Sequence, residues 1–84
     1  DANLSNSNLR DATLDSAVFD GTNLTNAVLE DAFAFNTRFL NATVEGADLT
    51  HVPLRADALK VLCANAEGVN PVTGRDTRET LGCS

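Results

Sequence analysis

Hydrophobic residues recur at every fifth position between residues 2 and 56, and eleven repeats follow one another without a gap. Each repeat has a central residue that is usually large and apolar, and a small residue two positions earlier. In the first nine repeats, Asn, Asp, Ser or Gly stands two positions after the centre. The central residues are Leu4, Leu9, Leu14, Phe19, Leu24, Leu29, Ala34, Phe39, Val44, Leu49 and Leu54.

A period of five fits neither of the regular secondary structures. A helix turns by about 100° per residue, so central residues five apart would scatter over all of its faces. Side chains alternate along a strand, so successive centres would point to opposite faces of a sheet. The centres stay together in a solenoid in which each repeat forms one side. The small polar residue then turns the corner, because Asn, Asp and Gly tolerate the backbone angles of tight turns.

This pattern resembles the pentapeptide-repeat family, whose consensus is Ala-(Asp/Asn)-Leu-X-X, over 55 of the 84 residues. The resemblance implies an all-β solenoid, a right-handed quadrilateral β-helix with four repeats in each coil and about three coils here. Coils would stack about 4.8 Å apart, so residues twenty apart would lie above one another. The implied core columns are Leu4, Leu24 and Val44; Leu9, Leu29 and Leu49; Leu14, Ala34 and Leu54; and Phe19 with Phe39.

Most positions beside the centres are polar, as expected of a solvated outer surface. Phe33 and Phe35 flank Ala34, the smallest central residue, and an exposed aromatic pair suggests a docking surface for another protein. Two alternatives remain: the C-terminal tail could cover both rings, or a local twist could turn one ring inward beside Ala34. The predicted docking residues are Val18, Val28, Phe33, Phe35 and Leu40.

The period changes after residue 56, so we predict a β-helix over residues 1–56 and a helical C-terminal cap over residues 57–84. Apolar residues at helical spacing predict a first helix, capped by Asp57 and ended by Gly68, that covers the open end of the last coil. Asp76 begins a sequence that resembles a capping box and predicts a short second helix.

The two cysteines, Cys63 and Cys83, both lie in the predicted cap. A disulfide between them would close a loop of about 20 residues and add roughly 3 kcal/mol if loop-closure entropy is the main contribution. Two cysteines in so short a chain favour a disulfide in an oxidising compartment, with two reduced buried thiols as the alternative.

The composition argues against several classes of function. A net charge of −6 opposes binding to nucleic-acid phosphates, and no apolar run is long enough for membrane insertion. The sequence has no Ser–His–acid set, phosphate-binding loop or metal-ligand spacing, so we expect neither an enzyme nor a cofactor or small-molecule substrate. His51, the single histidine, is interpreted as a corner residue. Because the chain opens in repeat register at Ala2, we expect a processed form or a partner over the first coil.

The segment between the cysteines carries a second resemblance. Its Asn70-Pro71-Val72-Thr73-Gly74 run, followed by Thr77-Arg78, is similar to the tail of thylakoid-lumenal and cyanobacterial pentapeptide-repeat proteins. This resemblance implies a chloroplast or cyanobacterial origin, a lumenal location and a disulfide across the cap. It implies no enzymatic activity.

These observations predict a non-catalytic structural or interaction protein of the thylakoid lumen that docks on a photosynthetic membrane complex, such as a photosystem supercomplex. One alternative is a DNA mimic that inhibits a gyrase-type topoisomerase, although under three coils would span only about 14 Å. The other is a lumenal thiol redox sensor in which Cys63 and Cys83 cycle between oxidised and reduced forms.

Overall fold

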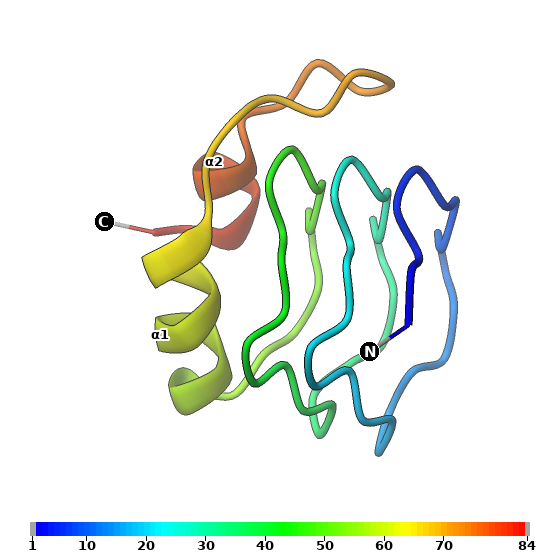
Figure 1. The fold of residues 1–84 in the computed structure, drawn as a ribbon, viewed down its shortest axis with the longest axis vertical. Helices are drawn as coiled ribbons and strands as arrows, with labels where there is room; N and C mark the ends of the chain where they lie inside the picture. Colours follow the sequence, from blue (N-terminus) through cyan, green and yellow to red (C-terminus); the bar gives the residue numbers. More distant parts are fainter. Residues whose placement is uncertain (1, 84) are drawn as a thin grey trace.

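The computed structural model describes residues 2–83 as stacked turns of chain with two helices at one end (Figure 1). Asp1 and Ser84, the outer bounds of the two predicted parts, lie outside the described residues. The chain winds through its turns from blue to green, and the helices α1 (Ala56–Asn65) and α2 (Thr77–Leu81) lie beyond the last turn.

Residues twenty apart pair with each other in parallel. Each pairing is a bridge of a single residue, and the described part of the chain contains no longer strand, because a tight turn occupies two of the five residues on each side. The register step of twenty holds from Asn3 to Asp48. The first turn is therefore residues 2–21, the second turn is residues 22–41, and the third turn begins at residue 42. The four sides of a turn are numbered in chain order, and in the first turn they begin at residues 2, 7, 12 and 17. The parallel bridges join Asn3 to Asn23, Asn8 to Val28, Thr13 to Phe33, Val18 to Arg38, Asn23 to Thr43, and Val28 to Asp48.

The backbone hydrogen bonds repeat from side to side. The N–H of Leu4 donates to the carbonyl of Asn23 on the next turn at 2.8 Å, and the carbonyl of Leu4 accepts from the N–H of Ser7 at 3.2 Å. The second bond closes a tight turn whose third residue has a positive φ, as at Asn6 (62°) and Asp31 (62°). Asn, Asp and Gly adopt this conformation at low cost, which explains the polar residue at the end of each repeat.

Asn36 departs from this corner geometry. Among the corners between Asn6 and His51, all within the described chain, it alone lacks a positive φ. Its backbone N–H donates to the carboxylate of Asp15 on the turn below, at 2.9 Å. The corner between the third and fourth sides is therefore irregular on the second turn.

The central residues of the second and third turns form the core. Leu24, Leu29, Val44 and Leu49 are buried, and Phe39 meets the ring of Phe19 edge to face with centroids 5.7 Å apart. Central residues of the first turn have a neighbouring turn on one side only, so they keep part of their surface exposed. The partly buried members of the predicted columns are Leu4, Leu9, Leu14, Phe19 and Leu54.

The first helix begins and ends at other residues than predicted. Arg55 is the N-cap of α1 and makes no side-chain capping bond, so the prediction that Asp57 caps this helix is wrong. The helix starts directly after the third side of the coil, which places Asp57 inside its first turn. Gly68 does not end the helix, because Ala66 is already the C-cap and Gly68 lies in the loop that follows.

The second helix follows the predicted capping pattern. Asp76 accepts hydrogen bonds from the N–H groups of Arg78 at 2.9 Å and Glu79 at 3.4 Å. A disulfide joins Cys63 in α1 to Cys83 just after α2, as predicted. The apolar faces of the two helices belong to the same core as the coil, with Leu62 and Leu81 buried.

Asn70 fastens the loop between the helices to the coil. It is fully buried, and its side-chain amide shares its two hydrogens among three carbonyl groups of the coil. Its Oδ1 accepts from the N–H groups of Val72 and Thr73, both at 2.9 Å. The three coil carbonyls are those of Asn26 at 3.3 Å, Ala27 at 3.2 Å and Gly46 at 2.9 Å.

A buried carboxylate lies beneath the same loop. Arg75 Nη1 lies 3.2 Å from Asp48 Oδ2 and 3.2 Å from Glu30 Oε2, so one guanidinium bridges two turns of the coil. Burial raises the pKa of Asp48. Hydrogen bonds from Thr50 and Thr73 and the charge of Arg75 lower it, and together they outweigh burial, so the pKa lies below its ordinary value.

Truncation within one column should show the effect of stacking. We expect Leu24→Ala to lower the free energy of unfolding by about 3 kcal/mol, because Leu24 is enclosed by turns on both sides. Leu4→Ala, the matched control in the same column, should cost clearly less because Leu4 is only partly buried. Guanidinium unfolding followed by circular dichroism measures both, and equal losses would contradict the stacked arrangement.

Removal of the Asn70 amide should destabilise the protein strongly. We expect Asn70→Ala to cost about 2–3 kcal/mol, since it leaves buried carbonyl groups without donors. Asn65→Ala is the matched control, because the Asn65 side chain makes one exposed bond to the carbonyl of Val61. Its stability should change by no more than about 0.5 kcal/mol. If thermal denaturation shows the same loss for both variants, Asn70 does not fasten the loop.

Asp48 should make stability sensitive to acid. Because its pKa is lowered in the folded state, its contribution is complete above the unfolded-state value near 4 and is lost as the pH falls through the folded value. Asp48→Asn should therefore flatten the decline in unfolding free energy below about pH 4. Denaturant titrations at a series of pH values test this, and parallel curves for the two proteins would refute it.

Candidate functional site

Four apolar side chains stand out on the surface of the coil, and we call them the docking face. Phe33 and Phe35 belong to the third side, while Val18 and Leu40 belong to the fourth side, across the corner at Asn36. Their exposed fractions are 62% for Val18, 49% for Phe33, 43% for Phe35 and 53% for Leu40.

The alternation of side chains along the third side explains the exposure of the two rings. Phe33 bridges to Thr13 on the turn below, and Ala34 between the rings faces inward and is fully buried. Both phenylalanines therefore point outward. The tail does not bury them, because its loop lies over the second side of the coil, where Asn70 bonds to the carbonyl of Ala27.

Val28 does not belong to this surface, which corrects the sequence-based prediction. It has an outward position on the second side but is only 2% exposed. The tail loop that holds Asn70 lies against this side, and Val28 is in one column with the buried Asp48. Sequence periodicity places a side chain inside or outside the coil, but it does not show where a distant segment folds back.

Sequence reasoning missed two exposed valines on the tail loop. Val69 is 55% exposed and Val72 is 70% exposed, on the loop that covers the second side. In the sequence, the neighbouring Asn70-Pro71 pair contributes only to the resemblance to lumenal family tails. In the structure, Asn70 accepts from the N–H groups of the two residues after Pro71, and its buried amide contacts had no signal in the sequence.

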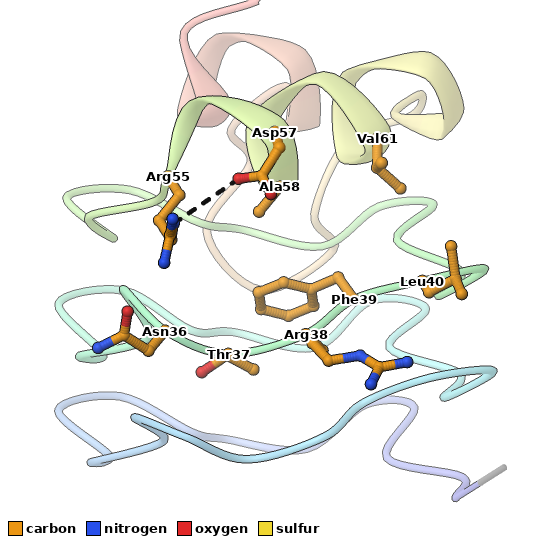
Figure 2. A pocket seen from close by; sticks show the side chains of 9 residues that line it. All are labelled: Asn36, Thr37, Arg38, Phe39, Leu40, Arg55, Asp57, Ala58 and Val61. Carbon is orange, nitrogen blue, oxygen red and sulfur yellow. Dashed lines mark ion pairs between the residues drawn. The ribbon is translucent and has the colours of Figure 1, made fainter.

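A groove of about 340 Å³ separates the fourth side from α1 (Figure 2). The ring of Phe39 lies between the coil and the helix, with Arg55 and Asp57 toward one end and Leu40 and Val61 toward the other. The full lining consists of Asn36, Thr37, Arg38, Phe39, Leu40, Arg55, Asp57, Ala58 and Val61.

The titratable side chains do not form a metal centre in the described residues, where no group of three or more potential ligands occurs. His51 is a corner residue with a φ of 60°, and its Nδ1 lies 3.1 Å from Asp31 Oδ1 on the turn below. Within residues 2–83, neither helix has the length and apolar character needed to cross a bilayer.

Comparison with known proteins agrees with this architecture. The family model described as pentapeptide repeats matches residues 1–31 and 20–55, with eight copies of the repeat. Thylakoid lumenal 15 kDa protein 1 of Arabidopsis thaliana is 54% identical over 41 residues, which cover 49% of this chain and 18% of that protein. Thylakoid lumenal protein TL20.3 of the same plant is 45% identical over 40 residues, or 48% of this chain and 14% of that protein.

The chain thus spans less than a fifth of the curated relatives that it matches. Among solved structures, a pentapeptide repeat protein from the Arabidopsis thaliana thylakoid lumen superimposes with a TM-score of 0.73 at 45% identity. That match covers 99% of this chain and 61% of the other. Proteins with these repeats form right-handed β-helices, and the structural match supports this fold here. The repeats, the relatives and the disulfide together show that this chain belongs to the pentapeptide-repeat family and is a thylakoid-lumenal member of it.

Proposed function

We propose that this chain is a non-catalytic interaction module of the thylakoid lumen that docks on a photosynthetic membrane complex through its docking face. The observation that supports this proposal most directly is the exposure of Val18, Phe33, Phe35 and Leu40 on two adjacent sides of the coil. Apolar side chains held outward on a hydrogen-bonded scaffold favour association with a protein surface.

The two parts of the chain have different tasks in this proposal. The repeats up to residue 56 form a scaffold of about three coils, and the segment from residue 57 onward forms a cap over the last coil. The disulfide between Cys63 and Cys83 strengthens that cap by linking α1 to the end of α2. The side surfaces then remain available to a partner while the core at this end stays covered.

The alternative functions have less support. The described residues measure 28 × 26 × 21 Å, which gives a DNA mimic neither the length nor the rod shape that it needs. A thiol redox sensor would require the Cys63–Cys83 disulfide to open and close, whereas in this structure the disulfide is formed and links α1 to the end of α2.

Affinity capture from solubilised thylakoid membranes tests the docking proposal. The wild-type protein should retain subunits of a photosystem, a cytochrome complex or a dehydrogenase complex. The double variant Phe33→Ser/Phe35→Ser should retain at least about tenfold less, because it removes both aromatic side chains from the docking face. Quantitative mass spectrometry of the retained subunits gives the ratio.

The matched control is Val69→Ser/Val72→Ser, which removes two comparably exposed apolar side chains from the tail loop. This variant should retain the wild-type amount. Recovery of no photosynthetic subunit by the wild-type protein, or equal recovery by both double variants, would refute docking through the phenylalanine pair.

A further inference from the structure

The corner between the two halves of the docking face lacks a ladder bond that the other corners have. At a regular corner, the last N–H of a repeat donates to a carbonyl of the next turn. Between the first and second turns, within the described chain, the bond from Ser16 to Phe35 is absent. The other three corners have it: Asn6 to Thr25 at 2.9 Å, Asp11 to Glu30 at 3.1 Å, and Gly21 to Leu40 at 2.9 Å.

Phe35 and Asn36 have no ladder bond to the third turn either. The backbone N–H and carbonyl of Phe35 make no hydrogen bond within the described residues. At a regular corner, the N–H of Asn36 would donate to the carbonyl of Arg55, but that carbonyl accepts from the N–H of Leu59 at 2.9 Å. Figure 2 shows Asn36 and Arg55 at the same end of the groove. The start of α1 thus uses the acceptor that a regular corner would need.

Side chains replace the missing ladder bonds. Asp15 Oδ1 accepts from the N–H of Asn36 at 2.9 Å, and Asp15 Oδ2 lies 3.5 Å from Asn36 Nδ2. The hydroxyl of Thr37 donates to the carbonyl of Leu14 at 2.6 Å, and the N–H of Thr37 closes the corner turn at 3.2 Å. Of these contacts, only the one with Asp15 holds the peptide group that joins Phe35 to Asn36.

This peptide group adjoins one of the two aromatic side chains of the docking face. The side chain of Phe35 is 43% exposed, so the protein encloses it only in part. A group that moves freely before association must be ordered when a partner binds, and this ordering weakens the affinity. A contact that fixes the backbone beside Phe35 beforehand reduces that cost.

We propose that Asp15 is a positioning residue of the docking face, an inference that rests on the proposed docking. Its carboxylate oxygen fixes the peptide group between Phe35 and Asn36 and thereby presents Phe35 to the partner with little backbone freedom. The acceptor oxygen has this role, rather than the negative charge. An amide oxygen at the same position can therefore replace it.

Hydrogen exchange in the free protein tests the positioning without a partner. Asp15→Ala removes the acceptor and should speed exchange of the Asn36 amide at least about tenfold. Asp15→Asn keeps an acceptor oxygen and should leave this rate within about threefold of the wild-type value. Two-dimensional NMR of the isotope-labelled proteins measures the exchange of each amide.

Asp20→Ala is the matched control for the exchange measurement. The Asp20 carboxylate also accepts a backbone N–H from the second turn, that of Leu40 at 3.2 Å. The corner after Leu40 has the regular geometry, with a φ of 59° at Asn41. Asp20→Ala should therefore speed exchange of the Leu40 amide and leave that of Asn36 unchanged.

Affinity capture from solubilised thylakoid membranes then measures the effect on docking. Asp15→Ala should retain at least about threefold less of the photosynthetic subunits than the wild-type protein, because Phe35 is no longer held in place. Asp15→Asn should retain the wild-type amount. Equal losses in the two variants would assign the effect to charge and would overturn the proposal.

Two further results would also overturn it: wild-type exchange of Asn36 in Asp15→Ala, or faster exchange with undiminished retention. Recovery of no photosynthetic subunit by the wild-type protein would refute the docking and, with it, any role of Asp15 in docking. The exchange measurement contains no membrane complex, so it shows separately whether Asp15 fixes the peptide group, and the two failures can be distinguished.

Discussion

The structure depends on the backbone hydrogen bonds that join each turn of the coil to the next in a register of twenty residues. Bonds such as those from Leu4 to Asn23 and from Leu24 to Thr43, both 2.8 Å, hold each turn against the next. They require that every side contain the same number of residues, so that donors and acceptors remain opposite each other. They also require corners that turn the chain from one side to the next within two residues, and the positive φ values at Asn6, Asn26 and their equivalents provide this. The core columns follow from the same register.

The tail continues the ladder on two sides of the coil and leaves it open on the other two. The carbonyl of Glu67 accepts from the N–H of Gly46 at 2.8 Å, in the position that a further repeat would occupy. The hydroxyl of Thr80 accepts from the N–H of Leu49 at 3.1 Å. On the third side, Pro53 has no N–H to donate to the turn below. On the fourth side, α1 replaces the next repeat and covers Phe39, which is buried.

The docking face and the groove both lie where the regular pattern ends or is broken. The docking face meets the irregular corner at Asn36, and the groove exists because the chain enters α1 one repeat before the third turn is complete. The second side, where the ladder is intact, carries instead the buried network of Asp48 and Arg75 under the tail loop. The network around Asp48 and the exposed apolar side chains of the docking face thus lie on different sides of one coil.

The sequence by itself determined the period, the corner positions and the inward columns. These features are local or strictly periodic. The five-residue spacing of central residues such as Leu4 and of corner residues such as Asn6 is therefore enough to predict them. The capping role of Asp76 was also local and predictable. Only the tertiary structure decided that the loop folds over the second side, buries Val28 and Asp48 and places the Asn70 amide against three coil carbonyls. Those contacts join residues more than twenty positions apart without periodicity, so the geometry of the folded tail alone specifies them.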